Sequence, residues 1–160
     1  MGMKQKTLFK LSDYTSEFGG ELLEGKRKTR RPLSINLSHH IILDADITDC
    51  GSLVKHQQLI RNILREHARK FNVFLHEISV NSNHCHLHLQ FQHRNFYLGF
   101  IRTVTASLRK ELNVRWHLRP YSRMVTKGRE FQNVNLYVER NQYEANGTTV
   151  YKRRRAGVSS

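Results

Sequence analysis

The segment "HCHLHLQF", residues 84 to 91, most constrains what this chain can fold into. Side chains alternate between the two faces of a β-strand, so residues two apart lie on the same face. The apolar face would hold Cys85, Leu87, Leu89 and Phe91, and the polar face His84, His86, His88 and Gln90. We therefore expect a strand that buries one face and presents three imidazoles to a groove or to solvent.

A second strand is expected directly before this one. The segment "VFLHEISV", residues 73 to 80, is rich in β-branched and aromatic residues, which is typical of strands. Asn81, Ser82 and Asn83 lie between the two segments and favour a turn, because their side chains bond to their own backbone. The two segments together predict a β-hairpin whose second strand carries the histidines near the turn.

Hydrophobic periodicity predicts the remaining elements. They are a strand over 33–43, a helix from a cap at Asp49 or Ser52 to Phe71, a helix over 95–112 capped by Asn95, a strand over 114–126 bent at Pro120, and a helix over 130–145. With the hairpin, this order predicts an α+β fold: a ferredoxin-like antiparallel β-sheet with helices on one face, plus a C-terminal helix. We expect the other face of the sheet to be free for binding.

The chain is strongly basic, with 27 Lys and Arg residues against 13 acidic ones and a net charge of +14. Two clusters contribute much of this charge: Lys26, Arg27, Lys28, Arg30, Arg31, and Lys152, Arg153, Arg154, Arg155. Removing these nine charges from +14 still leaves +5, so the expected folded part is basic too. A nucleic acid is the expected partner, because phosphate neutralisation releases counterions.

The sequence predicts one domain over residues 31–147, a flexible basic N-terminal arm over 1–30 and a basic C-terminal tail over 148–160. It has no long apolar run for a membrane helix or a secretory signal. Its two cysteines make no disulfide framework. We expect a cytoplasmic protein that is nucleoid-associated when bound to DNA, and either a monomer or a homodimer.

Two pairs of side chains suggest chemistry. His84 and His86 share a strand face and could chelate one divalent ion, although two exposed surface histidines would give the same pattern. Tyr137 and Asn141 are four residues apart on a predicted helix, so they share a helical face. The Tyr137 phenol could act as a nucleophile and Asn141 could supply an oxygen ligand, unless Tyr137 only borders the apolar core. In a basic protein, the combination favours a site that cleaves a phosphodiester.

Three motifs resemble those of the HUH endonucleases, named for a His-hydrophobic-His signature. They are "NHCHLHL" at 83–89, "WHLRPYSRMV" at 116–125, which resembles the Trp-containing strand of single-tyrosine transposases, and "YVERN" at 137–141. The last resembles the Tyr-x-x-x-Asn motif of the REP-associated tyrosine transposases. The resemblance covers the chain from about Arg31 to Gly147.

This resemblance implies a function and a set of roles. His84, His86 and Asn141 would bind Mg²⁺ or Mn²⁺, and Tyr137 would attack a phosphate of single-stranded or hairpin DNA. The products would be a 5′-phosphotyrosine link and a free 3′-OH, which allows strand transfer without ATP. The two basic clusters would hold the DNA backbone. From its place on the strand alone, His88 is too far along to reach the same ion as His84, so it is either a contact to the substrate, a support for the metal ligands, or a residue without a role in the site.

The chain also departs from the motif pattern. Cys85 occupies the hydrophobic position, which suits a small apolar side chain. Gln142 follows Asn141 where the REP-associated group usually has proline, and His88 stands where an aliphatic residue is common. Tyr143 and Tyr151 are rival nucleophiles, but Tyr143 lies on a different helical face from Asn141 and Tyr151 lies in the predicted tail.

Two other functions remain open from the sequence. A non-catalytic protein could use the same fold and basic surface to bind a DNA or RNA hairpin, since RRM domains also have a ferredoxin-like sheet. A structural zinc site could use His84, His86 and a remote ligand such as His39 or His40, because two cysteines cannot form a Cys-rich site.

Overall fold

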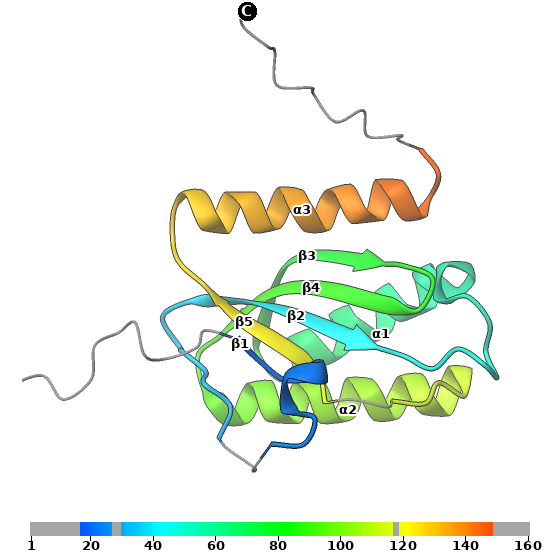
Figure 1. Cartoon of the computed structure of the whole chain (residues 1–160), viewed down its shortest axis with the longest axis horizontal. Helices are drawn as coiled ribbons and strands as arrows, with labels where there is room; N and C mark the ends of the chain where they lie inside the picture. The colour runs from blue at the N-terminus through cyan, green and yellow to red at the C-terminus, as the bar shows by residue number, and fades with distance from the viewer. Residues whose placement is uncertain (1–16, 27–29, 117–118, 149–160) are drawn as a thin grey trace, which may run out of the picture.

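A computed structural model describes residues 17–26, 30–116 and 119–148 (Figure 1). The elements are β1 (Glu17–Phe18), the 3₁₀ helix η2 (Gly20–Leu23), β2 (Ser38–Asp44), the 3₁₀ helix η3 (Leu53–His56), α1 (Gln57–Lys70), β3 (Val73–Val80), β4 (His84–Phe91), α2 (Arg94–Leu112), β5 (Tyr121–Val125) and α3 (Arg129–Ala145). The described part of the chain contains no helix with the length and apolar character needed to cross a membrane.

The five strands form one antiparallel sheet in the order β1-β5-β2-β4-β3. Without the short β1, the order β5-β2-β4-β3 is that of a ferredoxin-like β-α-β-β-α-β unit, which confirms the predicted fold class. The predicted hairpin is also confirmed, because β3 pairs with β4 across the turn at 81–83. β2 lies against β4 with Ile42 opposite His86 and Asp44 opposite His84.

One face of the sheet packs on α1 and α2 and forms the main core. Alternation in β4 places Cys85, Leu87, Leu89 and Phe91 on this face, all fully buried. The amphipathic stripes of the two helices cover them, with Ile60 and Leu64 from α1 and Phe100, Val104 and Leu108 from α2. The core therefore fixes which residues of β4 point the other way.

The other face is partly covered by α3, which lies across the sheet on the side opposite α1 and α2 (Figure 1). Its apolar contacts are few: Val134 and Val138 pack with Phe131 against Val125 of β5. The helix packs mainly on β3 and β4. It does not cover the half of this face that β2 and β5 form, where a groove lies beside the helix. The prediction of a free face is therefore wrong for the half that carries His86 and His88, which are buried.

Four predicted boundaries also need correction. Residues 17–23, expected in a flexible arm, supply β1 and η2, because β1 pairs with β5. The strand expected over 33–43 begins only at Ser38, since the Ser34 and Asn36 backbone N–H groups donate to side chains and not to a ladder. Among the described residues of the strand expected over 114–126, only β5 and the isolated bridge residue Arg115 pair with another strand or segment. α2 begins at Arg94 with His93, not Asn95, at the N-cap position.

Candidate functional site

The two histidines of the HUH-like motif face each other on β4. The Nε2 atoms of His84 and His86 lie 3.0 Å apart. His84 is half-buried, and His86 is 3% exposed beneath α3. Burial, and then the neighbouring His84, lower the pKa of His86 to about 4, so this imidazole is neutral near pH 7. Neutral imidazoles are the form that binds metals.

A hydrogen bond sets the tautomer of His84. Its Nδ1 lies 2.8 Å from Oδ1 of Asn83, and an amide oxygen can only accept. The proton is therefore on Nδ1, and Nε2, which lies 3.0 Å from Nε2 of His86, carries a lone pair. The Asn81 side-chain amide, 2.9 Å from the same Nε2, donates to that lone pair. His84 is thus held in the tautomer that a metal ligand requires.

His40 of β2 supports His86 from the other side. Its Nε2 lies 3.0 Å from Nδ1 of His86, and the two rings stack with centroids 5.2 Å apart. Burial, and then His86, lower the pKa of His40 to about 3, so His40 is a neutral hydrogen-bond partner. If Nε2 of His86 is to carry a lone pair, its Nδ1–H must donate to His40.

The spacing of the two imidazole nitrogens fits the coordination of one divalent ion. With ligand distances of about 2.1 Å, two neighbouring ligands of one octahedral ion lie about 3.0 Å apart. Asn141, the third predicted ligand, donates from Nδ2 to the backbone oxygen of Tyr137 at 2.7 Å, and no described contact joins it to either histidine. Within the described residues, no group of three or more His, Cys, Asp or Glu side chains could hold a metal. The structure thus brings together two of the three predicted ligands.

Tyr137 lies beside these imidazoles. Its ring contacts His86 edge-on at a centroid distance of 5.5 Å and His40 at 5.8 Å. It remains 48% exposed, so the side chain is accessible from solvent. The predicted nucleophile and the predicted histidine pair therefore come together, although they lie about fifty residues apart in the chain.

His88 is fully buried, so in this structure it does not reach a substrate. Its Nε2 lies 2.8 Å from Oγ of Ser38, and its Nδ1 bonds to Oδ1 of Asn135 on α3. Its ring also packs against Phe131, with centroids 4.5 Å apart. His88 thus links the sheet to the helix two residues before Tyr137.

A second polar contact holds the other end of the same helix. Oε1 of Gln142 accepts hydrogen bonds from the backbone N–H of Val80 at 2.8 Å and from Nη2 of Arg61 at 2.7 Å. Its Nε2 donates to Oε1 of Gln57 at 3.1 Å. Gln142, the residue that departs from the family motif, therefore connects α3 with β3 and α1.

His39 lies on the core side of the sheet, away from the candidate site. Its ring stacks on Phe91 with centroids 4.8 Å apart, and its Nε2 accepts from the backbone N–H of Ser34. It therefore cannot share an ion with His84 and His86. Tyr143 is exposed and donates from its hydroxyl to Glu139 at 3.2 Å. Tyr151 lies outside the described residues.

The basic residues predicted to bind DNA have different surroundings. Lys26 and Arg30 are exposed, whereas Arg31 is directed inward. Nη1 of Arg31 donates to Oγ of Ser122 at 2.5 Å, and its guanidinium lies 4.6 Å from the centroid of the Phe18 ring. Arg31 therefore attaches β1 to the sheet. Arg27, Lys28 and the cluster Lys152–Arg155 lie outside the described residues.

Sequence reasoning missed a groove next to Tyr137. It has a volume of about 640 Å³ and is lined by His40, Ile42, Tyr121, Arg123, Glu130, Asn133, Val134 and Tyr137. The strand pairing that joins β2 to β5 creates it, and no local motif marks it. The period-two pattern of β5 could have placed Tyr121 and Arg123 on one face, but not beside the tyrosine helix.

No protein-family profile matches this chain, and no curated protein sequence matches it either. Among solved structures, a REP-associated tyrosine transposase bound to a REP hairpin is similar, with a TM-score of 0.56 and 10% sequence identity over 77% of this chain and 76% of that one. A candidate transposase from Deinococcus radiodurans R1 has a TM-score of 0.45 and 17% identity, over 72% of this chain and 98% of that one. The first similarity confirms the predicted resemblance at the level of architecture: the chain has a transposase-like fold, that of a REP-associated tyrosine transposase.

Proposed function

We propose that this protein is a metal-dependent single-stranded DNA endonuclease and strand transferase that acts on hairpin-forming DNA. One observation carries the proposal: an accessible tyrosine, Tyr137, packs edge-on against His86, whose Nε2 faces that of His84 at 3.0 Å. A nucleophile beside a pair of neutral imidazole ligands is the arrangement that phosphodiester cleavage through a tyrosine requires.

In the proposed reaction, the phenol oxygen of Tyr137 attacks a phosphorus atom of the DNA strand. A phosphorus–oxygen bond to tyrosine forms, and the bond from phosphorus to the 3′-oxygen breaks. The phenol loses its proton, and the departing 3′-oxygen takes one up, which leaves a 5′-phosphotyrosine link and a free 3′-OH. Attack by a 3′-OH on this link reverses the step and joins strands.

His84 and His86 would hold Mg²⁺ or Mn²⁺, with Asn141 as the proposed third protein ligand. When bound, the ion would polarise the phosphodiester and stabilise negative charge on its oxygens. The hydrogen bonds from His84 to Asn83 and from His86 to His40 would keep the coordinating nitrogens free of protons.

Hairpin DNA is the proposed substrate because the structurally similar transposase is bound to a REP hairpin. The net charge of +14 supports a polyanionic partner, and the exposed Lys26 and Arg30 are proposed phosphate contacts. We further propose that the clusters Arg27–Lys28 and Lys152–Arg155 contribute to the same electrostatic attraction.

Covalent trapping tests the proposed function. The protein is incubated with labelled hairpin-bearing single strands and Mn²⁺, denatured, and analysed on a gel for a protein–DNA adduct. We expect an adduct that is lost in Tyr137→Phe and in His86→Ala, while Tyr143→Phe retains it. An adduct that persists in Tyr137→Phe would contradict the assignment of the nucleophile.

A non-catalytic hairpin-binding protein is the second candidate. The observation that favours it is the Asn141 side chain, which bonds to the helix backbone and does not face the histidines. This alternative predicts a gel shift without an adduct, and binding that is unchanged by Tyr137→Phe and by EDTA.

A further inference from the structure

The groove beside Tyr137 has a floor formed by β2 and β5 and a wall formed by α3. Its floor consists of two cross-strand pairs, His40 opposite Arg123 and Ile42 opposite Tyr121, which share one face of the sheet. Its wall consists of residues of α3 that recur at three- and four-residue steps and so lie on one helical face. These wall residues are Glu130, Asn133, Val134 and Tyr137.

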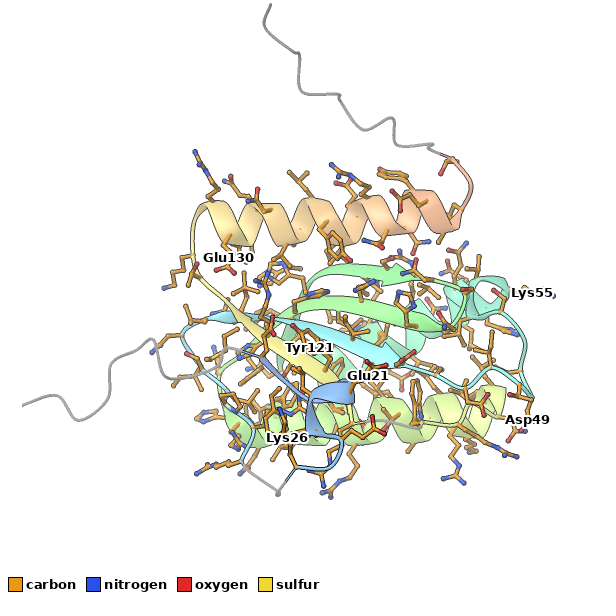
Figure 2. The ribbon with its side chains drawn as sticks, in the orientation of Figure 1. Glu21, Lys26, Asp49, Lys55, Tyr121 and Glu130 are labelled. Carbon is orange, nitrogen blue, oxygen red and sulfur yellow. The ribbon has the colours of Figure 1, made fainter. Side chains whose placement is uncertain are left out.

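Of the aromatic rings that line the groove, that of Tyr121 lies beside the apolar side chain of Ile42. Tyr121 of β5, labelled in Figure 2, is half-buried. It lies on the groove floor with Ile42 opposite it on β2, and Val134 lies in the wall. Burial, and then the neighbouring Glu17, raise the pKa of Tyr121 to about 12, so its ring stays neutral. A neutral aromatic ring at the bottom of an open groove is suited to stacking against another flat ring.

The charged groups of the groove are already paired. Nη1 of Arg123 lies 3.1 Å from Oε1 of Glu130, and Oε2 of Glu130 accepts from the backbone N–H of Thr126 at 2.8 Å. Because this ion pair leaves little net charge, the groove favours a neutral ligand over a phosphate. Asn133 is exposed at the wall and offers both an amide donor and an acceptor.

We propose that this groove binds one unstacked nucleobase of single-stranded DNA, which stacks on Tyr121 and hydrogen-bonds through its edge to Asn133. The proposal rests on the proposed function, because Tyr137 belongs both to the groove wall and to the contact with His86. A strand whose phosphate lies at Tyr137 therefore runs along the groove with an adjoining base beside Tyr121. The base would fix which phosphodiester meets the tyrosine.

Abasic scanning of the DNA tests this proposal. Hairpin oligonucleotides with single-stranded flanks receive one abasic site at a time, and binding is measured by gel shift with Tyr137→Phe, which retains the ring. We expect one flank position to weaken binding about tenfold, as expected for the loss of one base–aromatic stack. Tyr121→Leu in the same background should weaken binding to the intact strand by a similar factor and show no further loss at that position.

Two further variants make the test specific. Asn133→Ala, at an exposed residue, should remove the preference for one base at the same position, whereas Gln132→Ala, at the exposed neighbour outside the groove, should bind like its parent. If Tyr121→Leu and an abasic site weakened binding independently at every flank position, so that their factors multiplied, the proposal would be overturned. A fall of about one in the salt slope for Arg123→Gln would assign the groove to a phosphate and overturn it as well.

The test of the base site and the test of the proposed function can fail independently of each other. Coupling between Tyr121 and one abasic position, without a covalent adduct in the wild-type protein, would support the base site and reject the chemistry. An adduct without any such coupling would support the chemistry and reject the base site. Failure of the wild-type protein to bind any hairpin strand would overturn both.

Discussion

The polar attachment of α3 at Gln142 leads to the most direct prediction. Gln142→Leu removes the acceptor used by the backbone N–H of Val80, a fully buried residue, and by Nη2 of Arg61. A buried donor left without a partner costs about 1–3 kcal/mol, and the loss of the second bond is softened because Arg61 also donates to the Ile78 oxygen at 2.8 Å. We therefore expect about 2–3 kcal/mol of lost docking energy.

The loss should appear locally, because α3 has few apolar contacts with the sheet. Hydrogen exchange should show the amides of α3 less protected by about 30- to 150-fold, while those of β4 change little. Adduct formation should slow together with this loss, since Tyr137 meets the histidines only when the helix is docked. Gln142→Glu keeps the acceptor oxygens and should retain protection; Gln132→Leu, on the exposed side, is the control for the added leucine.

Three results would refute this reasoning. If Gln142→Leu and Gln142→Glu behaved alike, the acceptor oxygen would not be what holds the helix. If exchange in α3 increased while adduct formation stayed at the wild-type rate, the docked position of Tyr137 would not be the reactive one. A slower reaction without faster exchange would also separate the docking contact from the chemistry.

Two further predictions concern stability. Arg31→Ala should lower the free energy of unfolding by about 1–3 kcal/mol in a urea titration, because the hydrogen bond to Ser122 and the contact with the Phe18 ring are lost. Arg30→Ala, at an exposed residue, should leave the free energy of unfolding unchanged. Equal effects of the two substitutions would contradict the inward role of Arg31. In the folded protein the pKa of His40 is about 3 and that of His86 is about 4, both below the usual value for histidine of about 6.5. As the pH falls, the unfolded chain therefore takes up protons before the folded protein does. The free energy of unfolding should be highest above about pH 6.5 and decrease as the pH falls towards 4. A urea midpoint that stays constant between pH 7 and 4.5 would contradict this, and His40→Gln should make the decrease less steep.

The fold could be predicted from sequence where one periodicity dominates. In β4 the apolar residues at odd positions are all buried, and the two long amphipathic helices α1 and α2 lie where their stripes indicate. β1 could not be predicted, because two residues carry no periodic signal and the strand is held by the pairing with β5 and the side chain of Arg31. The backbone of residues 34 to 36 followed side-chain hydrogen bonds, which overrode the alternation of Leu33, Ile35 and Leu37.

The candidate site divides in the same way. Tyr137, His84 and His86 could be identified from sequence because motif spacing marks them, but the role of His40 could not. His39 and His40 are adjacent, and the apolar run at 41–43 hides which of the two shares the face of the core. Only the register with β4, which sets Ile42 opposite His86, sends His39 to Phe91 and His40 to the nitrogen of His86. A shift of that register by one residue would exchange the two histidines, and His86 would lose its hydrogen bond with His40.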